Sequence, residues 1–245
     1  RFPGLWPLLA TAEALEVTMI NSLAGQLPEG GLIIQRPFRE PHHSSSVAAL
    51  VGGGTKARPG EVSLAHGGVL VLDELAEWQR GHLDALRQTV ESGKAVVSRA
   101  NHHVTYPARF QLIAAMNPCR CGYLGDPARA CTKAPLCSRQ YLSRISGPML
   151  DRFDMMIEVG EVPISAMSRS GEGEDTAVIL ERVHAAREFA SIRPQQKDNP
   201  INAQLPPDRL EDAVRLQAKA SKLIEDAAEK QGLSARGYHR VLKVA

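Results

Sequence analysis

Hydrophobic and polar positions along the first two thirds of the chain switch between a helical and a strand-like pattern. Apolar residues recur at helical spacing over 10–23 and again over 75–90, and Gly25 is placed to end the first helix. Residues 69–72 are a short uninterrupted apolar run, and 110–116 are apolar except for Gln111. Short segments of this kind are typical of strands buried on both faces of a parallel sheet. This alternation of helix and strand predicts an α/β fold.

The remaining pattern divides the chain into two domains. A stretch rich in Ser, Gly and Glu predicts a linker over 163–175. Every periodic segment after it is helical, at 176–192 and 207–231, and Ser234 is placed to cap one more short helix. We therefore expect an α/β core over 1–162, the linker over 163–175 and a small helical domain over 176–245.

Composition and charge narrow the class of protein. With 43% hydrophobic and 23% charged residues, the 245-residue chain is expected to fold rather than to be disordered. No apolar run approaches the ~20 residues of a spanning helix, and no secretory signal is evident, so we expect a cytoplasmic protein without a membrane partner. Basic residues outnumber acidic ones over 36–60, 87–109 and 119–152. This excess favours binding of a polyanionic partner such as nucleotide or nucleic acid. The alternative is that these are ordinary solvated loops.

Acidic and amide side chains follow the two apolar runs. Asp73 and Glu74 come directly after the first run, and Asn117 follows the second. Ligands of parallel α/β sheets bind beyond the carboxyl ends of the strands. There Asp73 would hold Mg²⁺ through water and Glu74 would activate a water, while Asn117 would bond that water or a γ-phosphate. This is the Walker B and sensor 1 pattern of ATP hydrolases, with ordinary strand ends as the alternative.

Arginines in the second half of the chain are candidates for contacts with nucleotide. Arg152 is our first choice for a finger that reaches the γ-phosphate of a neighbouring subunit, and Arg144 is the rival. Arg236 and Arg240 lie on one face of the last predicted helix, where an arginine would act as sensor 2. Surface salt bridges are the alternative for each of them.

Four cysteines gather in residues 119–137 with the spacing C-x-C-x9-C-x5-C. Four thiolates are enough to close a tetrahedral structural zinc site. Reduced thiols that bind nothing and a redox disulfide pair are the two alternatives. The candidate zinc ligands are Cys119, Cys121, Cys131 and Cys137.

Long blocks of the chain resemble the Mg-chelatase-like AAA+ ATPases of the ComM/YifB type. The resemblance implies an AAA+ core with a helical lid, the use of ATP and Mg²⁺, and assembly into a homo-hexameric ring. It further implies a helicase that acts on branched DNA in natural transformation. The blocks that carry the resemblance are residues 36–43, 49–54, 58–66, 68–75, 114–122, 144–154 and 233–245.

The same resemblance assigns roles to individual residues. It implies that Asp73 and Glu74 are the Walker B pair, and it places a hairpin over 94–106 that points into the pore of the ring. Basic loops facing such a channel would grip phosphates without reading bases. The remaining implied roles are Asn117 as sensor 1, Arg152 as the finger, Arg236 as sensor 2, and Lys56, Arg58, Lys94 and Arg99 as contacts to DNA.

The phosphate-binding motif G-x-x-x-x-G-K-[ST] is absent from the sequence. In the family that the chain resembles, this motif lies just upstream of the segment matched by residues 1–5. We therefore expect an internal fragment that binds ATP poorly and hydrolyses none by itself. Two alternatives to a DNA motor stay open, namely a magnesium-chelatase-type ATPase motor subunit and a non-hydrolysing, zinc-stabilised nucleic-acid-binding protein.

Overall fold

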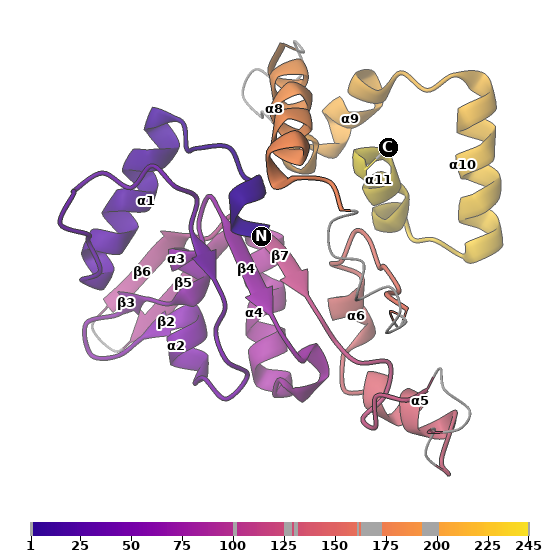
Figure 1. Ribbon diagram of the computed structural model, residues 1–245, viewed down its shortest axis with the longest axis horizontal. Coiled ribbons are helices and arrows are strands. Elements are labelled where there is room, and N and C mark those ends of the chain that lie inside the picture. Colours follow the sequence, from indigo (N-terminus) through magenta and orange to yellow (C-terminus); the bar gives the residue numbers. More distant parts are fainter. Residues whose placement is uncertain are drawn as a thin grey trace. The chain divides into compact units, whose positions relative to one another are not determined.

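The computed structural model contains two compact units, which are described one at a time (Figure 1). The larger unit spans Leu8–Phe153, and the smaller unit combines Arg1–Pro7 with Asp154–Ala245. The units thus divide earlier than the expected core boundary at residue 162, and the first seven residues belong with the helical unit. The structure describes residues 2–99, 102–124, 129, 132–160, 162, 173–192 and 201–244.

A three-stranded parallel sheet lies in the larger unit. Its strands are β1 (Phe38–Arg39), β4 (Val69–Leu72) and β7 (Gln111–Ala114), in the order β1-β4-β7. In the parallel register Leu72 pairs with Ala114, so the carboxyl ends of β4 and β7 meet at one edge. Helices flank this sheet, which confirms the predicted α/β class (Figure 1).

The two apolar runs differ in burial. Val69, Leu70 and Leu72 are almost fully buried, and β4 has a strand on each side. Among the described strands β7 has a neighbour on one side only, and its side chains are exposed or half-buried. The prediction that residues 110–116 are buried on both faces is therefore wrong, because Gln111 is exposed and the rest of β7 is only half-buried.

The first helix forms as predicted. Helix α1 covers Thr11–Ala24 and ends at Gly25, whose φ of 74° lies in the left-handed region that glycine adopts without strain. At the other end of α1, the Glu13 side chain accepts a hydrogen bond from the backbone N–H of Ala10 at 3.0 Å. The described residues of the larger unit form five further α-helices: α2 (Val47–Val51), α3 (Glu61–Leu64), α4 (Arg80–Ser92), α5 (Leu136–Leu142) and α6 (Gly147–Leu150).

The helix predicted over 75–90 is interrupted near its start. Leu75–Glu77 forms a 3-10 turn (η2), the backbone is extended at Trp78, and α4 begins only at Arg80. Trp78 is 3% exposed, and its Nε1 donates to the backbone oxygen of Asp73 at 3.0 Å. We attribute the break in the helix to this indole, because Trp78 in a continuous helix would point in another direction and lose its buried position and its hydrogen bond to Asp73.

The predicted hairpin is confirmed. Strand β5 (Lys94–Arg99) pairs antiparallel with β6 (His102–Pro107), and Lys94 lies opposite Pro107. The expected tip at Asn101 lies outside the described residues.

A second antiparallel pair packs against the hairpin. Strand β2 (Gly52–Gly53) pairs with β3 (Arg58–Pro59). Gly52 has a φ of 119°, and a Cβ on it would lie 2.9 Å from Cγ2 of Val97 in β5. The approach of the two elements therefore requires glycine at this position.

Side chains from the sheet, α4, the hairpin, α5 and α6 share one hydrophobic core. Burial of each large apolar side chain contributes about 1.5–3 kcal/mol relative to leaving it in water. The main members are Leu70, Leu72, Leu83, Leu86, Val97, Tyr141, Ile145 and Met149.

Two arginines around β1 connect the sheet to helices. The Arg36 side chain is 9% exposed and donates to Glu13 of α1 at 2.8 Å and to the backbone oxygen of Gly67 at 2.7 Å. Arg39 makes a two-pronged pair with Glu61 of α3 at 2.6 and 2.7 Å, and the hydrogen bond with Glu61 raises the pKa of Arg39.

The smaller unit is helical, as predicted for the C-terminal part of the chain. Helix α8 forms over Thr176–Ile192 as expected, and it packs on the turn η1 (Phe2–Leu5), with the Arg187 guanidinium 5.4 Å from the centre of the Trp6 ring. The other elements among its described residues are η4 (Asn202–Gln204), α9 (Pro207–Val214), α10 (Ala218–Gln231) and α11 (Ala235–Val244).

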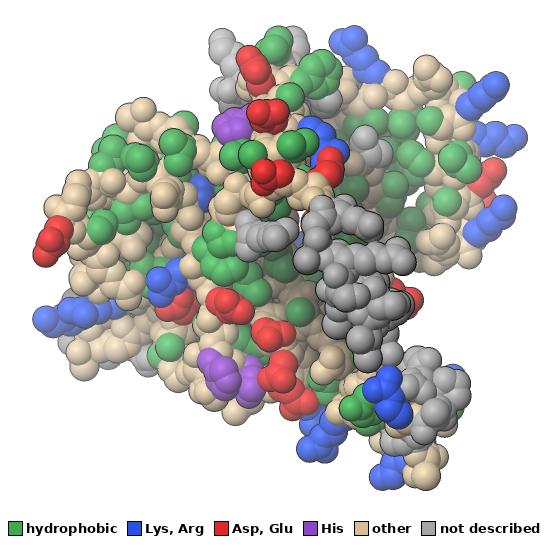
Figure 2. Space-filling view, viewed as in Figure 1, with side chains coloured by type: hydrophobic (Ala, Val, Ile, Leu, Met, Phe, Trp, Pro, Cys, Tyr) green, Lys and Arg blue, Asp and Glu red, His purple; other side chains and the backbone are tan. Residues whose placement is uncertain are grey.

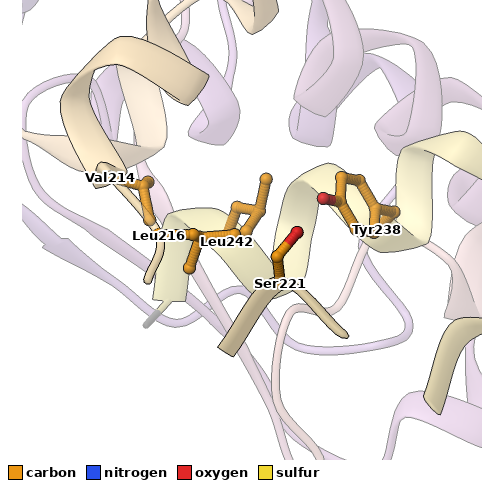
Figure 3. Close-up of a pocket in the computed structure, with 5 residues that line it drawn as sticks. All are labelled: Val214, Leu216, Ser221, Tyr238 and Leu242. Carbon is orange, nitrogen blue, oxygen red and sulfur yellow. The ribbon is translucent and has the colours of Figure 1, made fainter. Parts of the chain in front are cut away.

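The helix predicted over 207–231 is two helices. The chain turns between α9 and α10 at Arg215, which has a φ of 45°. Ser234 caps α11 as predicted, because its Oγ accepts from the backbone N–H of Gly237 at 3.1 Å. A hollow of about 250 Å³ between α9, α10 and α11 is lined by Val214, Leu216, Ser221, Tyr238 and Leu242 (Figure 3).

Among the described residues, no helix combines the length and apolar character that crossing a membrane requires.

Candidate functional site

The predicted Walker B and sensor 1 residues follow neighbouring strands. Asp73 and Glu74 come directly after β4, and Asn117 follows β7. The backbone pairing continues past the strand ends, because Ala115 donates to the oxygen of Leu72 at 3.0 Å. All three polar side chains are exposed. Two carboxylates and an amide thus extend from adjacent strand ends at one edge of the sheet, where their oxygens are the hard ligands that Mg²⁺ prefers.

The backbone holds the acidic pair in an unusual conformation. Glu74 has φ and ψ both at 49°, in the left-handed region that costs a non-glycine residue about 1–2 kcal/mol. Its N–H donates to Oδ1 of Asp73 at 2.8 Å, and the N–H of Leu75 donates to the oxygen of Ala115 on the β7 side at 2.9 Å. Together with the bond from Trp78 to Asp73, these contacts fix the direction in which Glu74 leaves the sheet.

A histidine that the sequence reasoning gave no role contacts this pair. Nδ1 of His43 lies 3.2 Å from Oε2 of Glu74, and the His43 ring lies 4.1 Å from that of His42, centre to centre. Figure 2 shows histidine side chains beside acidic ones on this face of the larger unit. The signal for His43 was topological: β1 is parallel to β4, so the segment after β1 emerges at the same edge as Asp73 and Glu74.

Arg144 lines a hollow of about 530 Å³ beside the turn η2, which follows Asp73 and Glu74. Its Nη1 donates to Oε2 of Glu77 at 2.8 Å and to the backbone oxygen of Ala76 at 3.2 Å, and its side chain is 44% exposed. Burial raises the pKa of the neighbouring Tyr141, and the charges of Glu77 and Glu74 raise it further. The residues that line the hollow are Ala76, Glu77, Trp78, Gln79, Arg80, Ser143, Arg144 and Ser146.

The Arg152 side chain is largely buried and bound by residues of the same chain. Its Nη2 donates to Oε2 of Glu91 on α4 at 2.6 Å, its Nη1 donates to the oxygen of Pro148 at 2.9 Å, and the side chain is only 10% exposed. To reach a neighbouring subunit, the guanidinium would have to leave Glu91, whereas Arg144 already reaches solvent. Arg236, the predicted sensor 2, lies on α11 in the other unit and is exposed.

The predicted contacts to DNA do not form one cluster. Lys56 and Arg58 are exposed on the β2–β3 pair. Lys94 begins β5 at the base of the hairpin and Arg99 ends it, which separates their backbones by roughly 17 Å. The side chain of Arg99 lies outside the described part of the structure.

Three of the four predicted zinc ligands come together. The Sγ atoms of Cys119, Cys121 and Cys137 all lie within 4.8 Å of one another. The fourth, Cys131, lies outside the described residues.

Two family models match the chain from end to end. "Magnesium chelatase, subunit ChlI" matches residues 1–167, and "Magnesium chelatase, subunit ChlI C-terminal" matches residues 173–245. These matches agree with the α/β unit and the helical unit that the structure contains.

Curated relatives match the whole chain. It is 46% identical over 247 residues to "Competence protein ComM" of Haemophilus influenzae, and 44% identical over 246 residues to "Uncharacterized protein YifB" of Escherichia coli. It is also 44% identical over 247 residues to "Uncharacterized protein Rv2897c" of Mycobacterium tuberculosis. Each match covers 100% of this chain and 47–48% of the relative, so the chain spans about half the length of these proteins. The chain belongs to the magnesium chelatase ChlI family, whose members combine an AAA+ α/β domain with a C-terminal helical domain.

Proposed function

We propose that the whole protein containing this chain is an AAA+ ATPase that uses Mg²⁺ and ATP to move along DNA. The observation that carries this function is the placement of Asp73, Glu74 and Asn117 at the ends of adjacent parallel strands. Open α/β sheets bind ligands at this edge. Membership of the magnesium chelatase ChlI family supports the use of ATP.

Each residue at the edge has a separate task. Asp73 would hold Mg²⁺ by accepting a hydrogen bond from one of its water ligands, and the ion would supply positive charge for the phosphate oxygens. Glu74 accepts a proton from the attacking water, and Asn117 donates its amide to that water or to the γ-phosphate. His43, 3.2 Å from the carboxylate of Glu74, acts as a positioning residue.

Hydrolysis takes place at interfaces of a homo-hexameric ring. Arg152 supplies positive charge to the nucleotide of the neighbouring subunit after leaving Glu91, and Arg144 is the alternative finger. Arg236 of the helical unit contacts the nucleotide as sensor 2.

DNA is the partner that the excess of basic residues in the first part of the chain favours. Lys56, Arg58, Lys94 and Arg99 would bind phosphates of a single-stranded or branched substrate without reading its sequence. A relative at 46% identity bears the name "Competence protein ComM", which supports a role in natural transformation. A cytoplasmic location belongs to the same proposal.

Strand displacement on forked DNA tests this function directly. The whole protein is expected to unwind the fork in the presence of Mg²⁺ and ATP, and Glu74→Gln is expected to abolish unwinding. Glu29→Gln, which neutralises an exposed glutamate away from the strand ends, is the matched control and should unwind normally. No unwinding by the unchanged protein, with intact ATP turnover, would contradict the DNA motor.

A magnesium-chelatase-type motor subunit is the second candidate, because both family models carry that description. It shares Asp73, Glu74 and Asn117 but would need dedicated partner subunits. ATP turnover that forked DNA does not stimulate would favour it. DNA binding without any turnover would instead favour a non-hydrolysing, zinc-stabilised binding protein.

A further inference from the structure

The cysteine cluster connects two segments that lie apart in the sequence. Cys119 and Cys121 belong to the turn that follows β7, and Cys137 lies in the first turn of α5. The Sγ atoms of Cys119 and Cys121 are 3.1 Å apart, and the three sulfurs lie within 4.8 Å of one another. Cys119 is fully buried and the other two are partly buried. Three thiols from two segments therefore come together at one partly buried place.

The surrounding backbone positions the thiols independently of any ion. Gly122 has a φ of 80°, and its N–H donates to the oxygen of Cys119 at 3.1 Å, which folds the C-x-C segment back on itself. Oγ of Ser138 donates to the oxygen of Pro118 at 2.7 Å and holds the start of α5 beside this turn. The cluster is thus the result of two turns that bring sulfur atoms together rather than of a flexible loop.

We propose that Cys119, Cys121 and Cys137 bind one Zn²⁺ ion through their thiolates. Zinc prefers soft sulfur ligands at about 2.3 Å, which places the sulfurs of a tetrahedral site roughly 3.8 Å apart. The observed spread of the sulfur atoms, up to 4.8 Å, reaches this geometry with small side-chain movements. Binding releases the protons of the three thiols and leaves one position of the tetrahedron for a further ligand.

The ion would join the two segments that carry predicted nucleotide contacts. Asn117 lies two positions before Cys119, and Arg144 follows the end of α5. Zinc would therefore fix the path of the chain from the end of β7 to the helix that leads to Arg144. This role concerns local structure and does not depend on ATP hydrolysis.

Elemental analysis of the whole protein, purified without added zinc and without a metal-affinity tag, tests the site. We expect about one zinc ion per chain, and less than about one fifth of that in Cys121→Ser and Cys137→Ser. Ser143→Ala removes a hydrogen bond at the far end of α5, away from the three thiols, and it should keep its zinc. Iron in place of zinc, or no metal after addition of zinc to the reduced protein, would overturn the site.

Cobalt substitution keeps the test independent of folding defects in the variants. The unchanged protein loaded with Co²⁺ alone should show the intense absorption bands of a tetrahedral cobalt–thiolate centre. Octahedral cobalt without thiolate charge-transfer bands would contradict the site, as would an intact mass showing a disulfide between Cys119 and Cys121 in the protein as purified.

Discussion

Nδ1 of His43 lies 3.2 Å from Oε2 of Glu74, and the two residues reach each other from the ends of β1 and β4. The Glu74 side chain is 52% exposed, so little packing holds it in place. Its carboxylate is oriented by the contact with His43 and by the left-handed backbone conformation of Glu74. A carboxylate that activates water must point at the attacking water. His43 is therefore expected to influence turnover more than nucleotide affinity.

Replacement of His43 separates positioning from binding. We predict that His43→Ala lowers kcat for ATP in the whole protein by about 10–100-fold, the equivalent of one hydrogen bond to a charged group. The KM for ATP should stay within a few-fold. His43→Asn, which can still donate to Glu74, should recover most of the activity, and His42→Ala is the control for loss of ring stacking. Equal losses in His43→Ala and His43→Asn would show that the contact has no positioning role.

Mixed rings distinguish the two candidate arginine fingers. Arg152→Ala and Glu74→Gln subunits should each be inactive alone, because a finger contributes about 10³-fold or more to turnover. A mixture should regain ATP hydrolysis, since a Glu74→Gln subunit still offers Arg152 to a neighbour with an intact Glu74. The same mixture made with Arg144→Ala is the comparison. Recovery with Arg144→Ala and none with Arg152→Ala would transfer the role to Arg144.

Arg36 is predicted to stabilise the larger unit through its buried contacts. Arg36→Met removes hydrogen bonds to Glu13 and to the backbone of Gly67, and should lower the free energy of unfolding by about 1–3 kcal/mol. Arg80→Met is the matched control, because Arg80 is 84% exposed and its change should stay within about 0.5 kcal/mol. Denaturant unfolding of both variants measures the difference, and equal stabilities would contradict the role of Arg36.

Glycine at position 52 is predicted to be essential for packing of the β2–β3 pair on the hairpin. In Gly52→Ala the new Cβ would lie 2.8 Å from the oxygen of Arg58 and 2.9 Å from Val97, so we expect a loss of stability of about 2 kcal/mol or more. Gly54 also has a positive φ, of 77°, but a Cβ there meets open space, so Gly54→Ala should cost about 1 kcal/mol. Thermal unfolding of the two variants compares them, and a smaller shift for Gly52→Ala would be inconsistent with the close approach.

Local sequence patterns predicted elements well where burial and spacing agree. β4, α8 and the hairpin follow directly from apolar runs and periodicity, and Gly25 and Ser234 mark helix ends by their own chemistry. The failures have tertiary causes. Trp78 breaks a helix because its indole is buried and bonded to Asp73, and the chain turns at Arg215 although the apolar spacing continues.

The sequence pattern singled out the two acids and the amide of the candidate site, but not the side chains that contact the site residues. Asp73, Glu74 and Asn117 are recognisable because they follow apolar strands. The contact of His43 depends on the order β1-β4-β7, which periodicity does not provide. The pairing of Arg152 with Glu91 likewise depends on how α4 and α6 pack.

ATP binding and ATP hydrolysis, measured separately in the whole protein, test the central claim most directly. Glu74→Gln should bind ATP with an affinity within a few-fold of the unchanged protein, and should hydrolyse it at least ~100-fold more slowly. Glu29→Gln should change neither quantity. Turnover by Glu74→Gln at the rate of the unchanged protein would contradict the assignment of the β4–β7 edge as the site of hydrolysis.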